Sequence, residues 1–471
     1  MVFSSAVFLF LFLPLFLVGV LLTARASLTA RNLNLVMFSL AFYFFGSGIY
    51  TLILLGSIGF NWAYAYYGFA NRSGRRWLAI GVMVNLLPLL VFKYLDFLMA
   101  LSSQLLFEPF FATALPELKL FLPAGISFYT FQAISYLLDV RRKETQAEPS
   151  LLTFAAYKLL FPQLVAGPIV RYVQIKQNLQ KATLSVAQFN AGIFFFGMGL
   201  AKKLVLADAL GRLVDSMYAQ RATDIDNWMA WLATVAYSLQ IFLDFSGYSE
   251  MAIGLGLMIG FQFPDNFLQP YRAHSITDFW RRWHVSLSLW FRDYLYIPLG
   301  GNRHGFWRTS ANLWVVFLLC GLWHGAALTF VLWGAYHGAL LTLERLIKRC
   351  FNVELKGAAG VMVTLVLVSI GWVLFRAESL DQASIVLKKL SFIDQAGTPR
   401  FGWQYTFTPY TLFLVTSGIV VAALPLERWR LGQRMQSDLS TIGALLGVGF
   451  MVLAIAALAA NGFNPFIYFQ F

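Results

Sequence analysis

Residues 311–333 read ANLWVVFLLCGLWHGAALTFVLW, and no acidic residue, lysine or arginine interrupts the chain from Ala311 to Tyr336. About 20 consecutive apolar residues are enough for an α-helix to cross a lipid bilayer. One ionisable residue, His324, lies inside this run. Because an ionisable group at membrane depth is costly to insert, such a residue is by default a candidate for function. The run therefore predicts a membrane protein with a chemically important histidine.

The composition of the whole chain agrees with membrane insertion. Of its 471 residues, 59% are hydrophobic and only 12% are charged, whereas soluble domains carry about 25% charged residues. We expect a single all-α, polytopic membrane domain over residues 1–471, with about 11 to 12 transmembrane helices. The apolar runs that predict these helices lie near 4–22, 31–48, 50–68, 78–98, 119–139, 187–209, 230–259, 311–330, 331–347, 358–376, 407–425 and 440–461.

The chain has a net charge of +13, and most of its lysines and arginines lie in short loops. When the predicted spans cross the membrane alternately, most lysines and arginines fall in loops on one side of it. The loops on the other side, such as 99–118 and 210–229, contain few lysines or arginines. Cytoplasmic loops are enriched in these residues, so we expect the basic side to be cytoplasmic and both termini to be extracytoplasmic. This explanation of the charge requires no nucleic acid. The basic residues concerned are Arg72, Arg75, Arg76, Arg141, Arg142, Lys143, Arg171, Lys176, Lys181, Lys348, Arg349, Arg428, Arg430 and Arg434.

Two stretches are too broken or too polar to be plain spans. In 151–170, Pro162, Gly167 and Pro168 interrupt an apolar run, and 264–300 alternates polar and apolar residues. Irregular backbone at membrane depth is tolerated only where protein or water covers it. We therefore expect both stretches to be re-entrant segments beside a cavity.

The second of these stretches contains DFWRRWHVSLSLW at 278–290, which places two arginines, an aspartate and a histidine in an otherwise apolar chain. We expect a single helix over 277–292, with Asp278 and Arg282 four residues apart as an ion pair. The alternative is an amphipathic helix at the membrane surface in which the histidine has no role. One face of the predicted helix carries Thr277, Trp280, Arg281, His284, Ser288 and Phe291.

His324 has the chemistry of a general base. Burial disfavours the charged imidazolium, and a neutral imidazole can take a proton from a hydroxyl or relay one. If the helix continues, the residues one turn away are Cys320, Gly321 and Leu328, where a substrate has room to approach. The alternative is a histidine that only hydrogen-bonds between helices.

The third polar constellation is LDFSGYSEMAIGLG at 243–256, in which Asp244 and Tyr248 interrupt a long apolar span. It is either a polar wall of the same cavity or the end of a span that reaches the headgroups. Lys202 and Lys203 come late in the preceding span. They either extend towards the membrane surface or line a polar interior.

The other histidines fit less active roles. His337 follows His324 by thirteen residues and falls on a different face of a continuing helix, so we expect it to pack. His274 and His304 lie in polar loops and are expected to be solvated. Cys320 with His324 is too small a ligand set for a metal site, and we expect none.

Several of these motifs together resemble the membrane-bound O-acyltransferase family, and within it the bacterial branch typified by the alginate O-acetylation membrane protein. The resemblance extends from the first residues to the last. It is carried by VFSSAVFLFLFLPLF, FLPAGISFYTFQAISYLLDVRR, FPQLVAGPIVR, LDFSGYSEMAIGLG, FPDNFLQPYRAHSITDFWRRWHVSLSLWFRDYLYIPLGGNR, GLWHGAALTFVLWGAYHG and NPFIYFQF.

The resemblance implies a central funnel or tunnel within a catalytic core near 119–347, and a site of two histidines, His324 and His284. It also implies a bacterial inner-membrane enzyme with acetyl-CoA as acetyl donor and no bound cofactor. An extracytoplasmic acetyltransferase is the implied partner, and an exported polysaccharide such as alginate is the implied target. We expect His324 to deprotonate the acceptor hydroxyl and His284 to orient the donor or polarise its carbonyl. The expected substrate-binding residues are Arg281, Arg282, Ser288, Arg292, Asp244 and Tyr248, with the arginines holding the phosphates of coenzyme A.

Two other functions fit the same polar features. A transporter or flippase of an acyl donor or lipid-linked sugar also needs polar residues and re-entrant segments inside the membrane. Such proteins often carry corresponding broken helices in two halves, and 151–170 and 264–300 show no such symmetry. A scaffold of a polymer-export complex is the third possibility.

Overall fold

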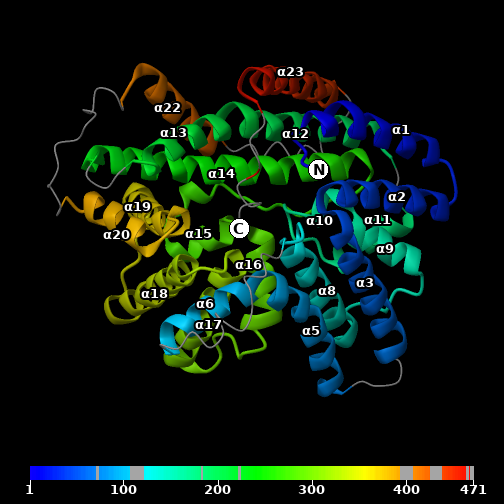
Figure 1. The fold of residues 1–471 in the computed structure, drawn as a ribbon, viewed down its shortest axis with the longest axis horizontal. Helices are drawn as coiled ribbons and strands as arrows, with labels where there is room; N and C mark the ends of the chain where they lie inside the picture. The colour runs from blue at the N-terminus through cyan, green and yellow to red at the C-terminus, as the bar shows by residue number, and fades with distance from the viewer. Residues whose placement is uncertain are drawn as a thin grey trace. The chain divides into compact units, whose positions relative to one another are not determined.

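The computed structural model describes residues 1–69, 74–106, 121–181, 184–220, 224–392, 407–424, 438–462 and 466. Within these residues all regular elements are helices and none is a strand (Figure 1). The expectation of an all-α fold is therefore confirmed. Of the basic residues used for the orientation, Arg72, Arg428, Arg430 and Arg434 lie outside the described residues.

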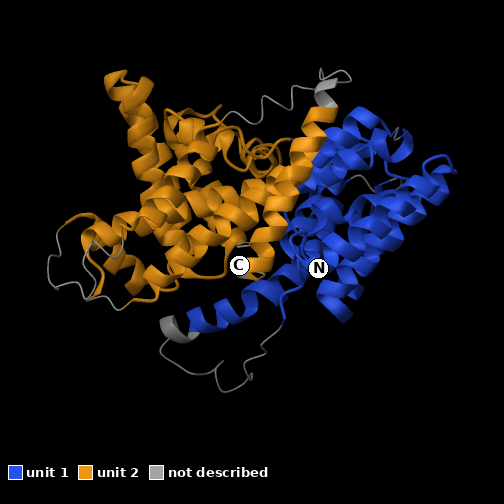
Figure 2. Ribbon diagram, turned by 90° about the horizontal axis from the view of Figure 1, so that it is seen from above, with its two compact units in different colours: residues 1–193, 251–264 blue, residues 194–250, 265–471 orange. Residues whose placement is uncertain are grey.

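The chain divides into two compact units, coloured separately in Figure 2. Unit 1 comprises residues 1–193 and 251–264, and unit 2 comprises residues 194–250 and 265–471. The expectation of a single domain over 1–471 stays a prediction. The helices of unit 1 are α1 (Leu13–Thr23), α2 (Leu28–Ser47), α3 (Thr51–Ala63), α5 (Arg75–Leu89), α6 (Leu95–Leu106), α8 (Ile126–Arg141), α9 (Leu151–Leu159), α10 (Phe161–Leu164) and α11 (Tyr172–Lys181).

Two helices, α12 (Val186–Ala201) and α14 (Asn227–Met258), contribute residues to both units. All the histidines lie in unit 2. The helices wholly within unit 2 are α13 (Asp208–Tyr218), α15 (Ile276–Arg282), α16 (Val285–Phe291), α17 (Gly305–His324), α18 (Leu328–Phe351), α19 (Gly357–Arg376), α20 (Leu380–Leu390), α22 (Pro409–Ala423) and α23 (Asp438–Asn461).

Short 3-10 and π segments interrupt or extend these helices. A π turn inserts an extra residue into a helix, and such turns are frequent at functional sites. Two segments bear on the site: η5 (Lys202–Ala207), which joins α12 to α13, and η8 (Arg292–Tyr296), which begins with Arg292. The other segments are η1 (Phe8–Phe12), η2 (Gly48–Tyr50), η3 (Tyr64–Gly68), η4 (Leu90–Tyr94) and η7 (Pro270–Arg272).

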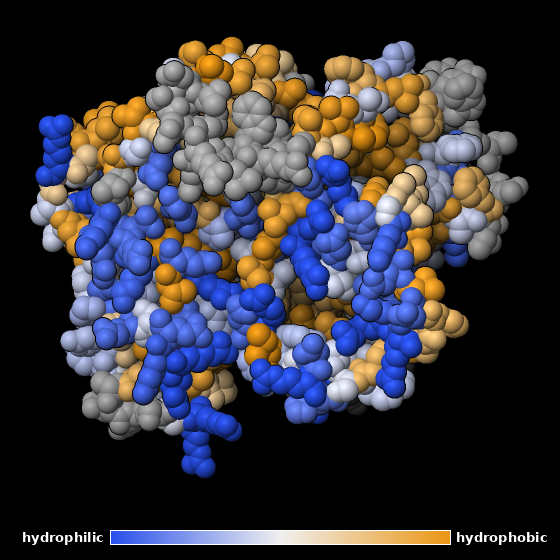
Figure 3. Space-filling model, turned by 180° about the vertical axis from the view of Figure 1, so that it is seen from behind, coloured by the Kyte–Doolittle hydropathy of each residue, from blue (hydrophilic) through white to orange (hydrophobic). Residues whose placement is uncertain are grey.

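Within the described residues, four helical stretches are long and apolar enough to cross a membrane: Leu28–Gly68, Arg75–Ser102, Gly357–Arg376 and Thr441–Ala460. Phe8–Thr23 and Pro409–Ala423 are apolar but shorter. Large apolar side chains lie exposed along these helices, as expected of groups that face lipid. Hydrophobic residues, in orange, also gather on parts of the face shown in Figure 3. The protein is a multi-pass membrane protein, and the count of 11 to 12 spans stays a prediction.

The pair α17 and α18 differs from the predicted spans 311–330 and 331–347. Helix α17 ends at His324, and Gly325 is extended with φ −157° and ψ 150° before α18 begins at Leu328. A Cβ at Gly325 would lie 2.1 Å from the ring of Phe330, so the turn that separates the two helices depends on a residue without a side chain. His324 is therefore at a helix end and not in the middle of a span.

Two glycines let α17 and α18 pack backbone to backbone. A Cβ at Gly321 would lie 2.3 Å from the carbonyl oxygen of Phe330, and one at Gly334 would lie 2.3 Å from that of Phe317. Such small residues allow close helix approach inside membranes. This contact fixes the end of α17, and with it the position of His324.

The stretch 151–170 is broken, as its prolines predicted. Helix α9 ends at Leu159, α10 is a single turn with Pro162 near its start, and Gly167 has a positive φ of 96°. From Tyr157 to Val170 every residue is buried. Irregular backbone in this stretch is thus covered by protein, which agrees with the rule for non-helical backbone at membrane depth.

Candidate functional site

The predicted single helix over 277–292 is wrong, because the helix breaks at His284. Helix α15 ends at Arg282, α16 begins at Val285, and His284 adopts left-handed backbone angles of φ 43° and ψ 55°. This conformation costs about 1–2 kcal/mol for a residue with a Cβ, although histidine tolerates it better than most. The amphipathic pattern continues across the break, so it gave no sign of it. The predicted ion pair is confirmed: Arg282 Nε lies 2.8 Å from Asp278 Oδ1.

Asp278 is held in its ionised form at the start of α15. Partial burial raises the pKa of this carboxyl, but the hydrogen bonds from Arg282 and from the His274 backbone, with the nearby charges, lower it below its ordinary value overall. Ser275 caps the same helix by accepting a hydrogen bond from the Asp278 N–H. These contacts fix α15 and the direction in which the chain enters His284.

The side chain of His284 is completely buried. Its Nδ1 lies 3.0 Å from Asn266 Oδ1. Its ring packs edge-on against Phe245 of α14 at 4.7 Å and against Trp323 of α17 at 6.0 Å between centroids. The Nε2 atom is buried and hydrogen-bonds to no other described residue. One ring nitrogen is thus anchored, and the other has no hydrogen-bond partner among the described residues.

His324 is the last residue of the 20-residue helix α17 and is only 4% exposed. Its ring contacts Trp323, Trp333 of α18 and Phe375 of α19, with centroid distances of 4.8, 5.2 and 5.2 Å. The free carbonyls at a helix C-terminus carry partial negative charge and favour a positive charge beside them. An imidazole here sits among apolar rings, yet it is next to a dipole that stabilises the proton it accepts.

One indole connects the two histidines. The ring of Trp323 contacts His324, its neighbour in sequence, and His284, which is forty residues earlier. The family resemblance implied a site of these two histidines, and the structure brings both rings against the same side chain. The surrounding rings exclude water, which is the competitor in any acyl transfer to a hydroxyl.

His337 packs, as expected. It is fully buried, and its Nδ1 accepts a hydrogen bond from Trp280 Nε1 at 3.3 Å. Its ring also contacts Trp333 at 5.1 Å, on the same indole that touches His324. His274 and His304 are both exposed, also as expected.

The expected substrate-binding residues fall into a buried pair and a more accessible group. Asp244 and Tyr248 are each only 2% exposed: Asp244 lies 3.0 Å from Lys203 Nζ, and Tyr248 stacks on Phe466 at 4.5 Å. The structure therefore gives Asp244 a cationic partner within the protein. Arg281 and Arg292 are exposed, Arg282 and Ser288 are half-buried, and Arg292 pairs with Asp293.

Lys202 and Lys203 line a polar interior and do not extend to a surface. Lys203 Nζ lies 2.7 Å from Asp208 Oδ1 as well as 3.0 Å from Asp244 Oδ1, and Lys202 Nζ lies 2.6 Å from Glu250 Oε1. Buried charges of this kind need partners. The positive pair of η5 is thus neutralised by carboxylates from α13 and α14, which stabilises the helix that carries Phe245 towards His284.

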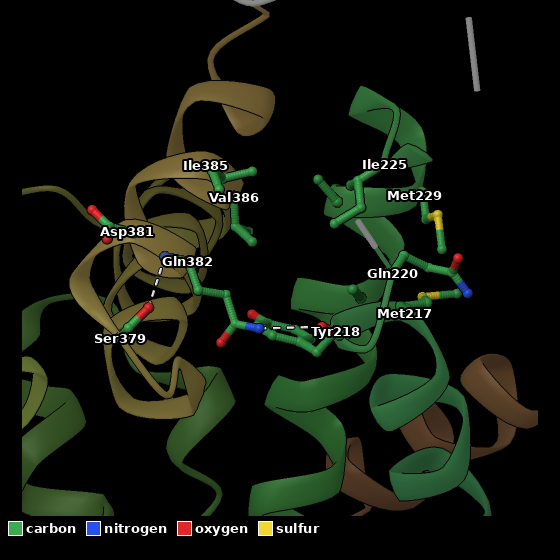
Figure 4. Close-up of a pocket in the computed structure, with 12 residues that line it drawn as sticks. Met217, Tyr218, Gln220, Ile225, Met229, Ser379, Asp381, Gln382, Ile385 and Val386 are labelled. Carbon is green, nitrogen blue, oxygen red and sulfur yellow. Dashed lines mark hydrogen bonds between the residues drawn. The ribbon is translucent and has the colours of Figure 1, made fainter. Parts of the chain in front are cut away.

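A pocket of unit 2 lies apart from both histidines (Figure 4). Its volume is about 260 Å³, and its wall is mostly apolar. Gln382 of α20 crosses its floor and donates a hydrogen bond to the carbonyl of Tyr218. The residues shown around it are Met217, Tyr218, Gln220, Ile225, Met229, Ser379, Asp381, Gln382, Ile385 and Val386. None of the residues expected in the site lines it.

Asn266 is the site residue that sequence reasoning missed. It is 2% exposed, and its Oδ1 faces His284, while its backbone carbonyl accepts the Val285 N–H at 2.9 Å. The only sequence signal is its place in the polar loop FPDNFLQP, eighteen residues before the histidine. Nothing in that spacing reveals the contact, because it depends on the fold of 264–285.

Similarity to known proteins extends over most of this chain. Residues 130–375, which include both histidines, match the family described as MBOAT, membrane-bound O-acyltransferase. The probable alginate O-acetylase AlgI of Pseudomonas aeruginosa is 45% identical over 392 residues, which cover 81% of this chain and 73% of that protein. That of Pseudomonas putida is 39% identical over the full length of both chains. The peptidoglycan O-acetyltransferase of Helicobacter pylori is 32% identical over 100% of this chain and 98% of that protein. The chain therefore belongs to the membrane-bound O-acyltransferase family, and it is an O-acyltransferase.

Proposed function

We propose that this protein passes an acetyl group from cytoplasmic acetyl-CoA across the inner membrane to an extracytoplasmic acetyltransferase. That partner then O-acetylates an exported polysaccharide such as alginate. The relatives named as probable alginate O-acetylases support the choice of group and of target. The observation that carries the proposal is the convergence of His284 and His324 on one buried indole.

The proposed reaction needs one base and a dry site. His324 takes the proton of the acceptor hydroxyl while the hydroxyl oxygen attacks the thioester carbonyl carbon. The tetrahedral intermediate collapses, the carbon–sulfur bond breaks, and the proton passes from His324 to the departing thiolate. The products are an acetyl ester and coenzyme A thiol. Phe375 and Trp333, which enclose the base, keep water from taking the acetyl group.

The donor is proposed to approach beside α15 and α16. Arg281, near the end of α15, and Arg292, directly after α16, are both exposed, and they can hold coenzyme A phosphates. Ser288 and Arg282 are half-buried on the same segment and are proposed to contact the rest of the donor. Asp244 and Tyr248 are proposed to shape the buried wall nearer the histidines, with Asp244 remaining bound to Lys203.

The decisive test is acetyl transfer by purified protein in lipid vesicles, with radiolabelled acetyl-CoA on the cytoplasmic side and the partner acetyltransferase on the other. We expect His324→Ala to lose at least about 100-fold in rate, with thermal unfolding near that of the wild type. His337→Asn is the matched control, because it is also a buried histidine replacement and keeps an acceptor for Trp280. Full activity of a folded His324→Ala variant would overturn the assignment of the base.

The same assay separates the enzyme from a transporter. A flippase moves an intact donor, so label would appear across the membrane still attached to coenzyme A or to a lipid.

Orientation is tested by single cysteines in a Cys350→Ser background, because Cys350 is exposed whereas Cys320 is buried. A cysteine beside Arg142 should resist an impermeant reagent added from the periplasm. Labelling there would reverse the proposed direction of transfer.

A further inference from the structure

We propose that Asn266 is a positioning residue that holds His284 in the tautomer with its proton on Nδ1. The Nε2 atom then presents a lone pair to the substrate. The inference builds on the proposed function, because it gives His284 the role of a hydrogen-bond and proton acceptor. It would replace the expected role of polarising the donor carbonyl, which requires an N–H at Nε2.

The orientation of the Asn266 amide follows from its neighbours. The backbone N–H of Ser286 can only donate, and it lies 3.3 Å from Asn266 Oδ1. If the amide were turned over, its NH₂ group would face that N–H, and two donors would meet. On the other side, Asn266 Nδ2 lies 3.1 Å from the hydroxyl of Ser249, which can accept. The amide oxygen therefore faces His284.

The tautomer of His284 follows from the orientation of the amide. The Nδ1 atom is 3.0 Å from the Asn266 oxygen, which has no proton to give. Two lone pairs at this distance repel, so Nδ1 carries the proton and donates it. A neutral imidazole has one proton on its ring, and Nε2 is then unprotonated.

The backbone makes the arrangement rigid. The Val285 N–H donates to the Asn266 carbonyl at 2.9 Å, and the Leu268 N–H donates to the Arg282 carbonyl at 2.9 Å. These two bonds connect the loop that carries Asn266 to the break that carries His284. They also offset the cost of the left-handed backbone at His284, which persists only when its surroundings determine it.

The described side chains that contact the ring carry no charge. Its described contacts are Phe245, Trp323, Asn266 and the hydroxyl of Ser286 at 3.5 Å. None of these groups titrates near neutral pH. The tautomer is thus set by hydrogen-bond geometry, and one side chain, Asn266, supplies the acceptor.

The test is the nitrogen-15 NMR spectrum of histidine-labelled protein in lipid vesicles, in which protonated and unprotonated ring nitrogens have distinct shifts. His284→Gln identifies the signals of this residue by difference. We expect the wild type to show protonated Nδ1 and unprotonated Nε2, and Asn266→Asp to keep that tautomer. A wild-type spectrum with the proton on Nε2 would overturn the proposal without any variant, whether or not the protein transfers acetyl groups.

Variants extend the test to activity. Asn266→Leu, which removes the acceptor, should mix the two tautomers and lower kcat by about 10- to 100-fold, with a smaller change in KM. Asn266→Asp adds a carboxylate that favours the imidazolium, so the acidic limb of its pH–rate profile should move up by about 1 to 3 pH units. Ser238→Ala is the control, because this buried hydroxyl on α14 bonds to Ser369 and not to Asn266. An unchanged His284 spectrum in folded Asn266→Leu would refute the positioning role.

If acetyl transfer fails in the wild type while the spectrum is as expected, the proposed function falls and the tautomer assignment stands. If transfer occurs and the spectrum shows the other tautomer, the tautomer assignment is refuted and the proposed function stands. The two proposals can therefore fail separately.

Discussion

Replacement of Lys203 by methionine tests a deeply buried charge network of unit 2. The ammonium lies 2.7 Å from Asp208 and 3.0 Å from Asp244, and the three side chains are only 3 to 5% exposed. Lys203→Met removes the ammonium that both buried carboxylates contact. Removal of one partner from a buried ion pair costs about 3–5 kcal/mol, and we expect a loss in the upper part of this range because two anions are left.

A matched series isolates the charge effect from the loss of packing. Lys202→Met removes an identical side chain from the neighbouring position, but its partner Glu250 is less buried, with 17% of its side chain exposed. We expect the loss of stability in this variant to be less than half as large. Asp244→Asn leaves Lys203 paired with Asp208, and its loss is also expected to be smaller. The triple variant Lys203→Met, Asp208→Asn, Asp244→Asn carries no charge at this place and should recover part of the stability.

The measurement is the free energy of unfolding in mixed micelles with increasing denaturing detergent, followed by circular dichroism. Lys203→Met within about 1 kcal/mol of the wild type would refute the reasoning, and so would a larger loss in Lys202→Met. The same proteins decide the role of Asp244. If it is mainly structural, Asp244→Asn lowers stability and leaves the KM for acetyl-CoA unchanged.

Three further predictions concern packing, buried amides and pH. Gly334→Ala should lower stability by about 1–3 kcal/mol and reduce activity, because the added Cβ would lie 2.3 Å from a carbonyl oxygen. Gly338→Ala should fold normally, because the nearest atom to its Cβ would be 3.4 Å away. Thermal unfolding and acetyl transfer of both variants check this. Asn61 and Asn85 bond reciprocally at 2.8 Å in a buried contact, so Asn85→Leu should cost about 1–3 kcal/mol and the double leucine variant less, as unfolding measurements would reveal. The pKa of Asp278 is lowered in the folded protein. Its small contribution to stability is therefore present above the ordinary pKa of about 3.9 and is lost as pH falls through the pKa of the folded state. The difference in stability between the wild type and Asp278→Asn should be constant near neutrality and disappear in strong acid.

Hydrophobic pattern alone was enough to predict the helices that face lipid. The predicted span 358–376 corresponds to α19 at Gly357–Arg376, and 440–461 corresponds to α23 at Asp438–Asn461. In these helices the environment is uniform, so length and apolarity determine where they begin and end. The prolines of 151–170 were an equally local signal, because proline cannot continue a helix interior.

The elements around the histidines were predicted less well, and for a physical reason. The break at His284 and the end of α17 at His324 occur where the apolar or amphipathic pattern continues unchanged. They are determined by contacts between distant segments. The backbone carbonyl of Asn266 accepts the Val285 N–H next to the break at His284. The ring of Phe330 occupies the space beside Gly325, where α17 ends. Local propensity carries no record of such contacts. Departures from regular structure of this kind are expected at functional sites.

The two breaks give the two histidines different electrostatic settings, and this difference favours a division of labour. His324 is at the carboxyl end of a 20-residue helix, where partial negative charge stabilises an imidazolium. His284 precedes the first residue of α16, and its Nδ1 proton is committed to Asn266, so nothing described beside it stabilises a second proton. A proton taken from the acceptor hydroxyl is therefore best held by His324, while His284 accepts a hydrogen bond and remains neutral. Exchange of the two roles would require Asn266 to become an anion, which is the change that Asn266→Asp introduces. If Asn266→Asp is more active than the wild type and no longer needs His324 for that activity, the roles of the two histidines are the reverse of those assigned.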